Sequence, residues 1–273
     1  MKIQFNDNGI HVFESSLYRT TSTVIELGQS ILIVDPNRLP MEIDFILGYI
    51  DEKYPTHQQY LLFTHSDYDH ILGYGAFPDA KVIASVTFYK CPIKADLIRL
   101  IKDFDSMYYI QRAYPIVFPE VDIIIDQDNQ CLIIDQFECF FYLAPGHVAD
   151  GLFMVIPQKN IWIAGDYLSN IEIPLVDHNF NDYQNTLLKV KEVFRKFDQI
   201  NLLIPGHGDL ATDRTEIYKR IKNDLNYLHL LNEYIITPDP NALEKLEKLT
   251  LQYSDNVELI SANKKNIQQA SMQ

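Results

Sequence analysis

The segment His65-Ser66-Asp67-Tyr68-Asp69-His70 places four side chains that can bind a metal within six residues, and the rest of the sequence is best interpreted from it. Neutral imidazole and carboxylate groups suit zinc, iron or manganese. The intervening serine and tyrosine would let a loop turn these side chains toward one centre. Packed together without counter-ions, they would suffer desolvation and carboxylate repulsion. The segment therefore predicts a metal centre.

Four apolar runs along the chain end in the same way, with a histidine or an aspartate just beyond a predicted strand. They are Leu61–His65, Phe140–His147, Ile161–Asp166 and Leu202–His207. If these strand ends lie on one rim of neighbouring sheets, residues far apart in sequence converge there. Rigid strands with short turns suit a metal site, because ligands must be held close to fixed coordination distances. Glycine beside the ligating residue indicates a tight turn or a close backbone approach.

The whole chain, residues 1–273, is predicted to form one compact α/β domain. Strands are expected at 10–13, 22–27, 30–34, 59–63, 81–84, 123–125, 131–134, 138–143, 152–156, 160–164 and 201–204, with Gly28-Gln29 as a hairpin turn. Helical spacing predicts helices at 40–54 and 182–197, a helical insertion at 85–109 and a helical C-terminal extension over 212–273.

Composition restricts the class of protein and its partners. The formal charge of −14 opposes binding to nucleic acid, and no run approaches the ~18 apolar residues of a membrane span. The first residues show no signal-peptide pattern, so we expect a soluble, cytoplasmic protein that acts on a small molecule. Cys91, Cys131 and Cys139 lack Cys-x-x-Cys spacing and are expected to be buried, reduced thiols.

Over residues 20–210 these motifs resemble the metallo-β-lactamase superfamily, whose signature is His-x-His-x-Asp-His followed by a distant His, an Asp and a last His. The resemblance implies a four-layered αββα sandwich that holds two divalent metal ions, with zinc preferred and iron or manganese as alternatives. The implied ligands are His65, Asp67 and His147 at one metal, Asp69, His70 and His207 at the other, and Asp166 between them. Asp35 matches a strand-end acid of the family, with a supporting role.

Asp67 departs from the family pattern, because it stands where a second histidine is usual. With two dications, three aspartates and one hydroxide, the centre would be neutral rather than singly positive, and therefore harder and less electrophilic. A related substitution by glutamate occurs in the diiron flavoprotein branch of the superfamily, which keeps iron as an alternative. Asp67 could instead cap a helix that begins near Asp69, or support the ligands without contacting a metal.

The resemblance implies a metal-dependent hydrolase that cleaves a small-molecule ester, lactone, thioester or related bond. A hydroxide bridging both metals would attack, and Asp69 would orient it or transfer a proton. Two alternatives remain open: a diiron redox or oxygen-handling protein, and a metal-binding regulatory module without turnover. The 85–109 insertion could line the pocket or only pack, and the loop with Tyr167 and His178 could line the pocket. The C-terminal helices could cover the sheet or form a homodimer face.

Overall fold

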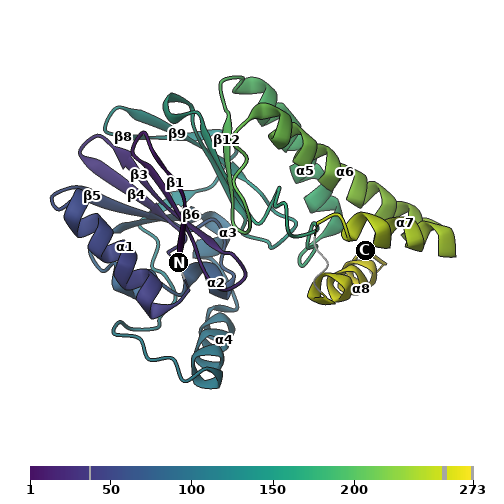
Figure 1. Ribbon diagram of the computed structural model, residues 1–273, viewed down its shortest axis with the longest axis horizontal. Helices are drawn as coiled ribbons and strands as arrows, with labels where there is room; N and C mark the ends of the chain where they lie inside the picture. Colours follow the sequence, from purple (N-terminus) through teal and green to yellow (C-terminus); the bar gives the residue numbers. More distant parts are fainter. Residues whose placement is uncertain (37, 254–256, 272–273) are drawn as a thin grey trace.

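The computed structural model describes residues 1–36, 38–253 and 257–271. Within them, two sheets lie face to face between two layers of helices (Figure 1). The first sheet follows chain order: β1 (Lys2–Asp7), β2 (Ile10–Glu14), β3 (Thr21–Leu27), β4 (Ser30–Val34), β5 (Gln58–Leu62), β6 (Lys81–Ser85) and β7 (Ile123–Ile125). The second has the order β12 (Leu202–Pro205), β11 (Ile161–Gly165), β10 (Leu152–Ile156), β9 (Phe137–Leu143) and β8 (Gln130–Ile134).

The helices divide between the two outer faces according to the cores they pack against. On the first sheet lie α1 (Pro40–Lys53), α2 (Tyr68–Ile71), α3 (Val86–Tyr89) and α4 (Lys94–Met107). On the second lie α5 (Phe180–Lys196), α6 (Arg214–Ile236), α7 (Pro240–Thr250) and α8 (Val257–Ser271). The predicted αββα sandwich is confirmed. That residues 1–273 form one domain stays a prediction.

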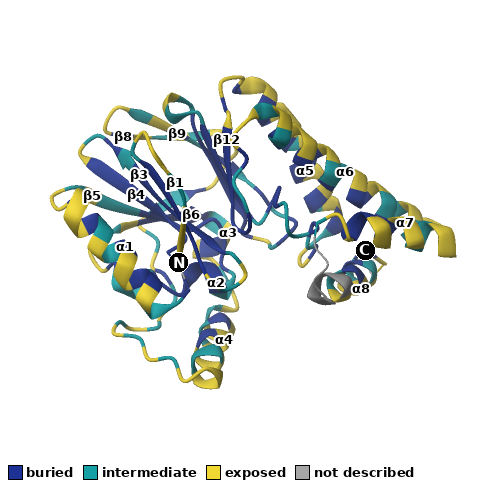
Figure 2. Ribbon diagram, in the orientation of Figure 1, coloured by how far each residue is buried: buried dark blue, intermediate teal, exposed yellow. Residues whose placement is uncertain are grey.

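Three apolar cores separate these layers, and the strands supply side chains to two of them at once. In β4, Leu32 and Val34 join the core between the sheets, whereas Ile31 and Ile33 pack under α1. Successive side chains of a strand point to opposite faces, so a strand covered on both sides is apolar throughout. Each such side chain contributes ~1.5–3 kcal/mol on burial. Figure 2 shows the inner strands as the most buried part of the chain.

Most predicted elements are present, with bounds that differ by one or two residues, and the Gly28-Gln29 hairpin is confirmed. Strand β1 was not predicted, because its edge position leaves polar residues at alternate sites. The 85–109 insertion is wrong as one helix: Pro92, which cannot continue a helix, lies between α3 and α4. Cys131 is exposed on β8 and Cys91 is only partly buried, so the prediction of three buried thiols is correct only for Cys139, although all three cysteines are free.

Among the described helices, none combines the length and apolar character that a membrane crossing requires.

A buried carboxyl group ties α6 to the loop after β11. Asp224 is 2% exposed and accepts hydrogen bonds from the Leu168 backbone N–H at 3.2 Å and from the Tyr253 hydroxyl at 2.8 Å. Burial raises the pKa of Asp224 to about 7, although both hydrogen bonds and the charge of Arg220 oppose this shift. The folded protein therefore holds a proton there that the unfolded chain releases at lower pH.

This proton makes stability depend on pH. Because the folded pKa of Asp224 lies above its unfolded value, the stabilisation is complete below about pH 4 and is lost as the pH rises through about 7. We expect Asp224→Asn to gain stability relative to wild type over this window, by on the order of a few kcal/mol. Denaturant titrations at several pH values measure the effect, with exposed Asp103→Asn as the control. Parallel pH profiles for wild type and Asp224→Asn would contradict it.

Candidate metal centre

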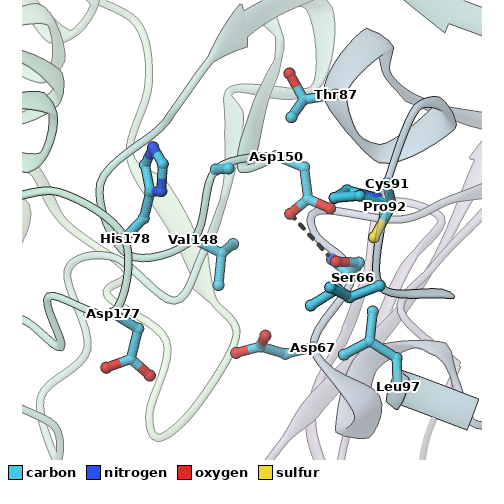
Figure 3. A pocket seen from close by; sticks show the side chains of 12 residues that line it. Ser66, Asp67, Thr87, Cys91, Pro92, Leu97, Val148, Asp150, Asp177 and His178 are labelled. Atoms are coloured by element: carbon cyan, nitrogen blue, oxygen red, sulfur yellow. Dashed lines mark hydrogen bonds between the residues drawn. The ribbon is translucent and has the colours of Figure 1, made fainter. Parts of the chain in front are cut away.

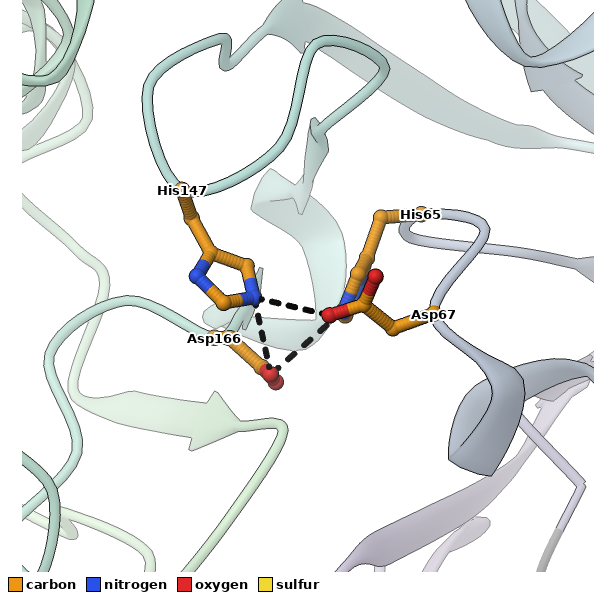
Figure 4. A group of neighbouring side chains, drawn as sticks. All are labelled: His65, Asp67, His147 and Asp166. Carbon is orange, nitrogen blue, oxygen red and sulfur yellow. Dashed lines mark hydrogen bonds and ion pairs between the residues drawn. The ribbon is translucent and has the colours of Figure 1, made fainter. Parts of the chain in front are cut away.

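The loops after β5, β9, β11 and β12 bring the predicted ligands together at one rim of the two sheets. The donor atoms form two groups, each able to surround a metal ion: His65, Asp67, His147 and Asp166; and Asp69, His70 and His207. Figure 4 shows the first group, with His65 and His147 directed at both Asp67 and Asp166. All seven predicted residues therefore lie in one cluster, divided between two positions as the resemblance implied.

Asp166 lies at the middle of this cluster. Its carboxylate oxygens lie 3.4 Å from Nε2 of His65 and 3.3 Å from Nε2 of His147. They also lie 3.2 Å from Nε2 of His70 and 3.4 Å from Nε2 of His207. One carboxylate thus faces the same ring nitrogen of four histidines, which is the arrangement expected of a ligand shared between two ions.

Asp67 and Asp69 complete the two groups from opposite sides. Oδ2 of Asp67 lies 3.2 Å from Nε2 of His147, and Oδ2 of Asp69 lies 3.4 Å from Nε2 of His207. Asp67 stands at the N-cap of α2, but its side chain makes no capping hydrogen bond. Its carboxylate is directed into the cluster, so the capping alternative is wrong.

The other ring nitrogen of each histidine is occupied by an acceptor, which leaves Nε2 for a ligand. Nδ1 of His147 donates to the Leu175 carbonyl at 2.9 Å, and Nδ1 of His207 donates to the Tyr18 carbonyl at 2.9 Å. A carbonyl oxygen only accepts, so the proton lies on Nδ1. Such outer hydrogen bonds are typical of metal-binding histidines, because they orient the ring and select its tautomer.

His70 and His65 follow the same rule through Asp35. Nδ1 of His70 donates to Asp35 at 3.1 Å. Asp35 also accepts from the Thr64 hydroxyl at 2.6 Å, and that hydroxyl oxygen accepts from Nδ1 of His65 at 2.9 Å. Asp35 has a φ of +43°, an uncommon conformation for a non-glycine residue, which the three hydrogen bonds to its carboxylate help to hold. Asp35 therefore has the predicted supporting role: it orients His70 directly and His65 through Thr64.

Several contacts in the cluster need positive charge between the atoms, as a proton or as a metal ion. Nε2 of His70 and Nε2 of His207 lie 3.2 Å apart, and in neutral rings with the proton on Nδ1 two lone pairs would face each other. Among the described residues, Nε2 of His65 and Oδ1 of Asp166 are buried without a hydrogen-bond partner. Unpaired buried polar atoms are costly. Divalent ions would satisfy all of them, so these residues fit a metal centre.

Charge in the cluster leads to the same conclusion. Burial disfavours charged imidazole, but the carboxylates of Glu172, Asp166 and Asp69 outweigh it and raise the pKa of His207 to about 10. Burial also disfavours the Asp67 carboxylate, yet His147 and His65 lower its pKa to about 2. The carboxylates thus attract positive charge, as protons or as metal ions. Metal binding will therefore release protons.

Gly206, which follows β12, lets the backbone pass close to the Asp166 side chain. A Cβ atom at this position would collide with the Asp166 carboxylate and would lie 3.0 Å from Cε1 of His70. The neighbouring Gly165 has a φ of +51°, in the left-handed region that glycine favours. The glycines beside the ligating residues therefore meet the backbone needs that the sequence predicted.

The C-terminal helix α8 supports His147 through one asparagine. Asn266 is fully buried, accepts from the Val176 N–H at 2.9 Å and donates to the Pro174 carbonyl at 2.7 Å. These bonds flank Leu175, whose carbonyl accepts from Nδ1 of His147. A residue more than a hundred positions away in sequence therefore holds the carbonyl that orients a predicted ligand.

Sequence reasoning missed Glu172, which lies in the loop between Asp166 and α5. Its carboxylate forms a third potential metal-binding group with Asp166 and His207, and Oε1 lies 3.9 Å from Nδ1 of His207. Burial raises the pKa of Glu172, and the charge of Asp166 adds to this although His207 opposes it. No ligand pattern surrounds Glu172 in sequence. The only available signal was its place in the loop predicted to line a pocket.

Two hollows open beside the cluster and share Asp67 and Asp177. The first, of about 250 Å³, has a largely apolar wall (Figure 3), with these lining residues: Ser66, Asp67, Thr87, Cys91, Pro92, Ile93, Leu97, Val148, Ala149, Asp150, Asp177 and His178. The second, of about 270 Å³, contains the potential ligands and is lined by Tyr18, Arg38, Asp67, Tyr68, Asp69, His147, Asp166, Glu172, Leu175, Asp177, His207 and Ala262.

These hollows decide two predictions that the sequence left open. The 85–109 insertion contributes Pro92 and Leu97 to the first hollow, so it forms a pocket wall as well as packing. His178 lines the same hollow, as predicted. Tyr167 lines neither hollow; it is buried, and its hydroxyl donates to the Ala144 carbonyl at 3.1 Å. The loop therefore lines the pocket, as predicted, through Glu172, Leu175, Asp177 and His178, whereas the Tyr167 ring packs in the core.

Comparisons with known proteins concern the family and the fold. The family described as the metallo-beta-lactamase superfamily matches residues 17–207. A sec-alkylsulfatase from Pseudomonas sp., Pisa1, superposes with a TM-score of 0.65 at 13% identity, over 88% of this chain and 43% of the alkylsulfatase. A metallo-beta-lactamase from Pontibacter korlensis superposes with a TM-score of 0.57 at 14% identity, over 82% of this chain and 98% of that protein. No curated protein matches significantly in sequence.

The chain thus spans less than half the length of the alkylsulfatase, and at these identities both likenesses concern the fold.

Metal binding should stabilise the fold and depend on Asp166. We expect zinc at ~100 times its dissociation constant to raise the free energy of unfolding by ~2.7 kcal/mol. Asp166→Asn should lose most of this gain, since it removes a charge that faces four histidines. Thermal unfolding with and without zinc, joined to elemental analysis, measures both effects. Asp224→Asn, which alters a buried aspartate outside the cluster, should respond like wild type. An equal response from Asp166→Asn would contradict the assignment.

The support from α8 can be tested separately. Asn266→Ala frees the Leu175 carbonyl from its two flanking bonds, so we expect one zinc ion to bind about 10–100-fold more weakly. Asn263→Ala is the matched control, because Asn263 is also buried in α8 and also bonds the Tyr227 hydroxyl, but makes no bond to residues 174–176. Zinc titration calorimetry compares the two variants. Equal affinities would show that α8 does not orient His147.

Proposed function

The chain belongs to the metallo-beta-lactamase superfamily, and from this we propose that it is a metal-dependent hydrolase of small molecules. We propose that it holds two divalent ions, zinc in the first place. The ligands would be His65, Asp67, Asp69, His70, His147, Asp166 and His207. The bond cleaved would belong to an ester, a lactone, a thioester or a related group.

One observation carries this proposal: four histidines present Nε2 to a single carboxylate, at 3.2–3.4 Å. Each of these rings is oriented by a hydrogen bond at Nδ1. A cluster that only stabilised the fold would place acceptors opposite donors. Here lone pairs and carboxylates converge beside a hollow large enough for a small molecule.

Bound dications would supply a water acidified from pKa 15.7 toward about 7 and would polarise the bond to be cleaved. The protein's own groups would do the rest. Asp69 is nearly buried, lines the second hollow and lies 3.4 Å from the Thr20 hydroxyl. A carboxylate held in this way can orient the attacking water and hold its proton. The apolar wall at Leu97 and Val148 would receive the uncharged part of the substrate.

Asp67 favours one alternative to zinc. Its carboxylate replaces an imidazole among the potential ligands, which makes the donor set richer in oxygen and better suited to iron or manganese. Elemental analysis of the purified protein, joined to its visible spectrum, separates these cases. A coloured, iron-rich protein without hydrolytic activity would favour the diiron redox function instead.

The hydrolase proposal predicts a specific pattern of loss and recovery. Treatment with a chelator should abolish hydrolysis, and adding back zinc should restore it. Asp69→Ala should lower kcat by about 100-fold or more, because the water loses its orienting carboxylate. A screen with chromogenic esters, lactones, thioesters and phosphodiesters provides the assay, and exposed Asp103→Ala is the control. Activity that survives both the chelator and Asp69→Ala would exclude this function.

A further inference from the structure

Arg38 is a buried cation without a counter-ion among the described residues. It lies in the loop between β4 and α1 and is 1% exposed. Nη2 donates to the Tyr68 hydroxyl at 2.5 Å, whereas Nε and Nη1 have no hydrogen-bond partner there. Among the described residues, the hydrogen-bond partners of the guanidinium include no carboxylate. Burying a charge in this way is costly, so an unpaired guanidinium needs an explanation.

The chain pairs another buried arginine as expected. Arg112 meets both carboxylate oxygens of Asp105 at 2.8 Å and also donates to the Arg38 carbonyl. Arg38 instead lies among aromatic rings: its guanidinium is 4.1 Å from the Tyr18 ring centre and 5.2 Å from that of Phe104. Aromatic faces offset part of the cost of burying a cation, but they leave the N–H donors of Nε and Nη1 unused.

Arg38 borders the hollow that holds the potential metal ligands, although Nε and Nη1 are themselves buried. Arg38 lines that hollow, and among the described residues that line either hollow it is the only lysine or arginine. Arg38 is connected to the cluster through its contacts with Tyr68 and Tyr18. Its hydroxyl partner Tyr68 lies between Asp67 and Asp69 in sequence, and the carbonyl of Tyr18 accepts from His207.

We propose that Arg38 binds a carboxylate of the substrate, so that the site acts on substrates with a negative charge close to the bond that is cleaved. This rests on the proposed hydrolase function. A guanidinium offers two parallel N–H donors that match a planar carboxylate. Metal ions would neutralise the aspartates of the cluster, and Arg38 would then provide the positive charge that admits an anion to an acidic protein.

Tyr18 covers this site. Its ring lies over the guanidinium and is half exposed, at 50%. Both Tyr18 and the next residue, Arg19, have positive φ, at +52° and +54°, which is an uncommon conformation for non-glycine residues. Displacement of this side chain toward solvent would uncover Nε and Nη1 while the backbone of Tyr18 keeps its bond to His207.

Binding of two small probes to the zinc-loaded protein tests the proposal. Succinate carries two carboxylates, one for the metal ions and one for Arg38, whereas butyrate carries a methyl group in place of the second. We expect wild type to bind succinate at least tenfold more tightly than butyrate by calorimetry, since hydrogen bonds to charged groups contribute this much. Arg38→Gln should abolish the preference. Arg38→Lys should reduce it, because lysine keeps the positive charge but lacks the two parallel N–H donors of a guanidinium.

Controls separate recognition from folding. Exposed Arg99→Gln should keep the preference, and circular dichroism with zinc content should show that each variant is intact. If Arg38→Gln does not fold, Arg38→Lys carries the test. A wild-type protein without a preference, or an intact Arg38 variant that retains it in full, would overturn the proposal. Because the assay needs no turnover, a protein that prefers succinate but hydrolyses nothing would contradict the hydrolase function and leave Arg38 as an anion site.

Discussion

The structure depends on one electrostatic constraint: the Asp166 carboxylate faces Nε2 of four histidines, and the hydrogen bonds at Nδ1 direct these nitrogens into the cluster. Such an arrangement is stable only with positive charge at its centre. In an acidic protein with further carboxylates around the cluster, that charge comes from bound cations or from protons taken up by the rings. The rest of the fold can be understood as the scaffold that keeps these lone pairs converging.

The four histidines are oriented mainly by groups that are not themselves potential metal ligands. Asp35 orients two histidines from the end of β4, one of them through Thr64. Backbone carbonyls of Tyr18 and Leu175 orient the other two. Asn266 shows how far this support extends, because α8, which packs against α6 and α7, holds the loop around Leu175. Helix α8 is therefore part of the site's support.

The two hollows beside the cluster differ in the chemical character of their walls. One hollow is walled by apolar side chains from the segment before α4 and from the loop after β9, and the other combines carboxylates with a buried guanidinium. A substrate that spans both would place an uncharged part against Leu97 and a charged part against Arg38. The division gives the proposed hydrolase a basis for selecting among small molecules, which the metal ligands alone would not provide.

The sequence alone was sufficient for the layers, for nearly all strands and for the seven residues of the cluster. The strands follow from local signals, namely alternating apolar residues and turn residues between them, whereas the layers and the full set of seven were implied by the resemblance to the superfamily. Edge strand β1 and the exposure of Cys131 were missed or wrong, because they depend on which neighbours cover each face. The break at Pro92 has a local cause, since proline cannot continue a helix.

Only the tertiary structure could reveal Glu172, Arg38 and Asn266. Each is an ordinary polar residue in sequence, and each acquires its role from partners brought close by folding. Burial is what gives them significance, since an exposed arginine or asparagine would be satisfied by water, whereas a buried one must find a partner in the protein or in a ligand. Sequence patterns record the spacing of residues along the chain, and this protein's substrate hollow is built from contacts between residues that are distant along it.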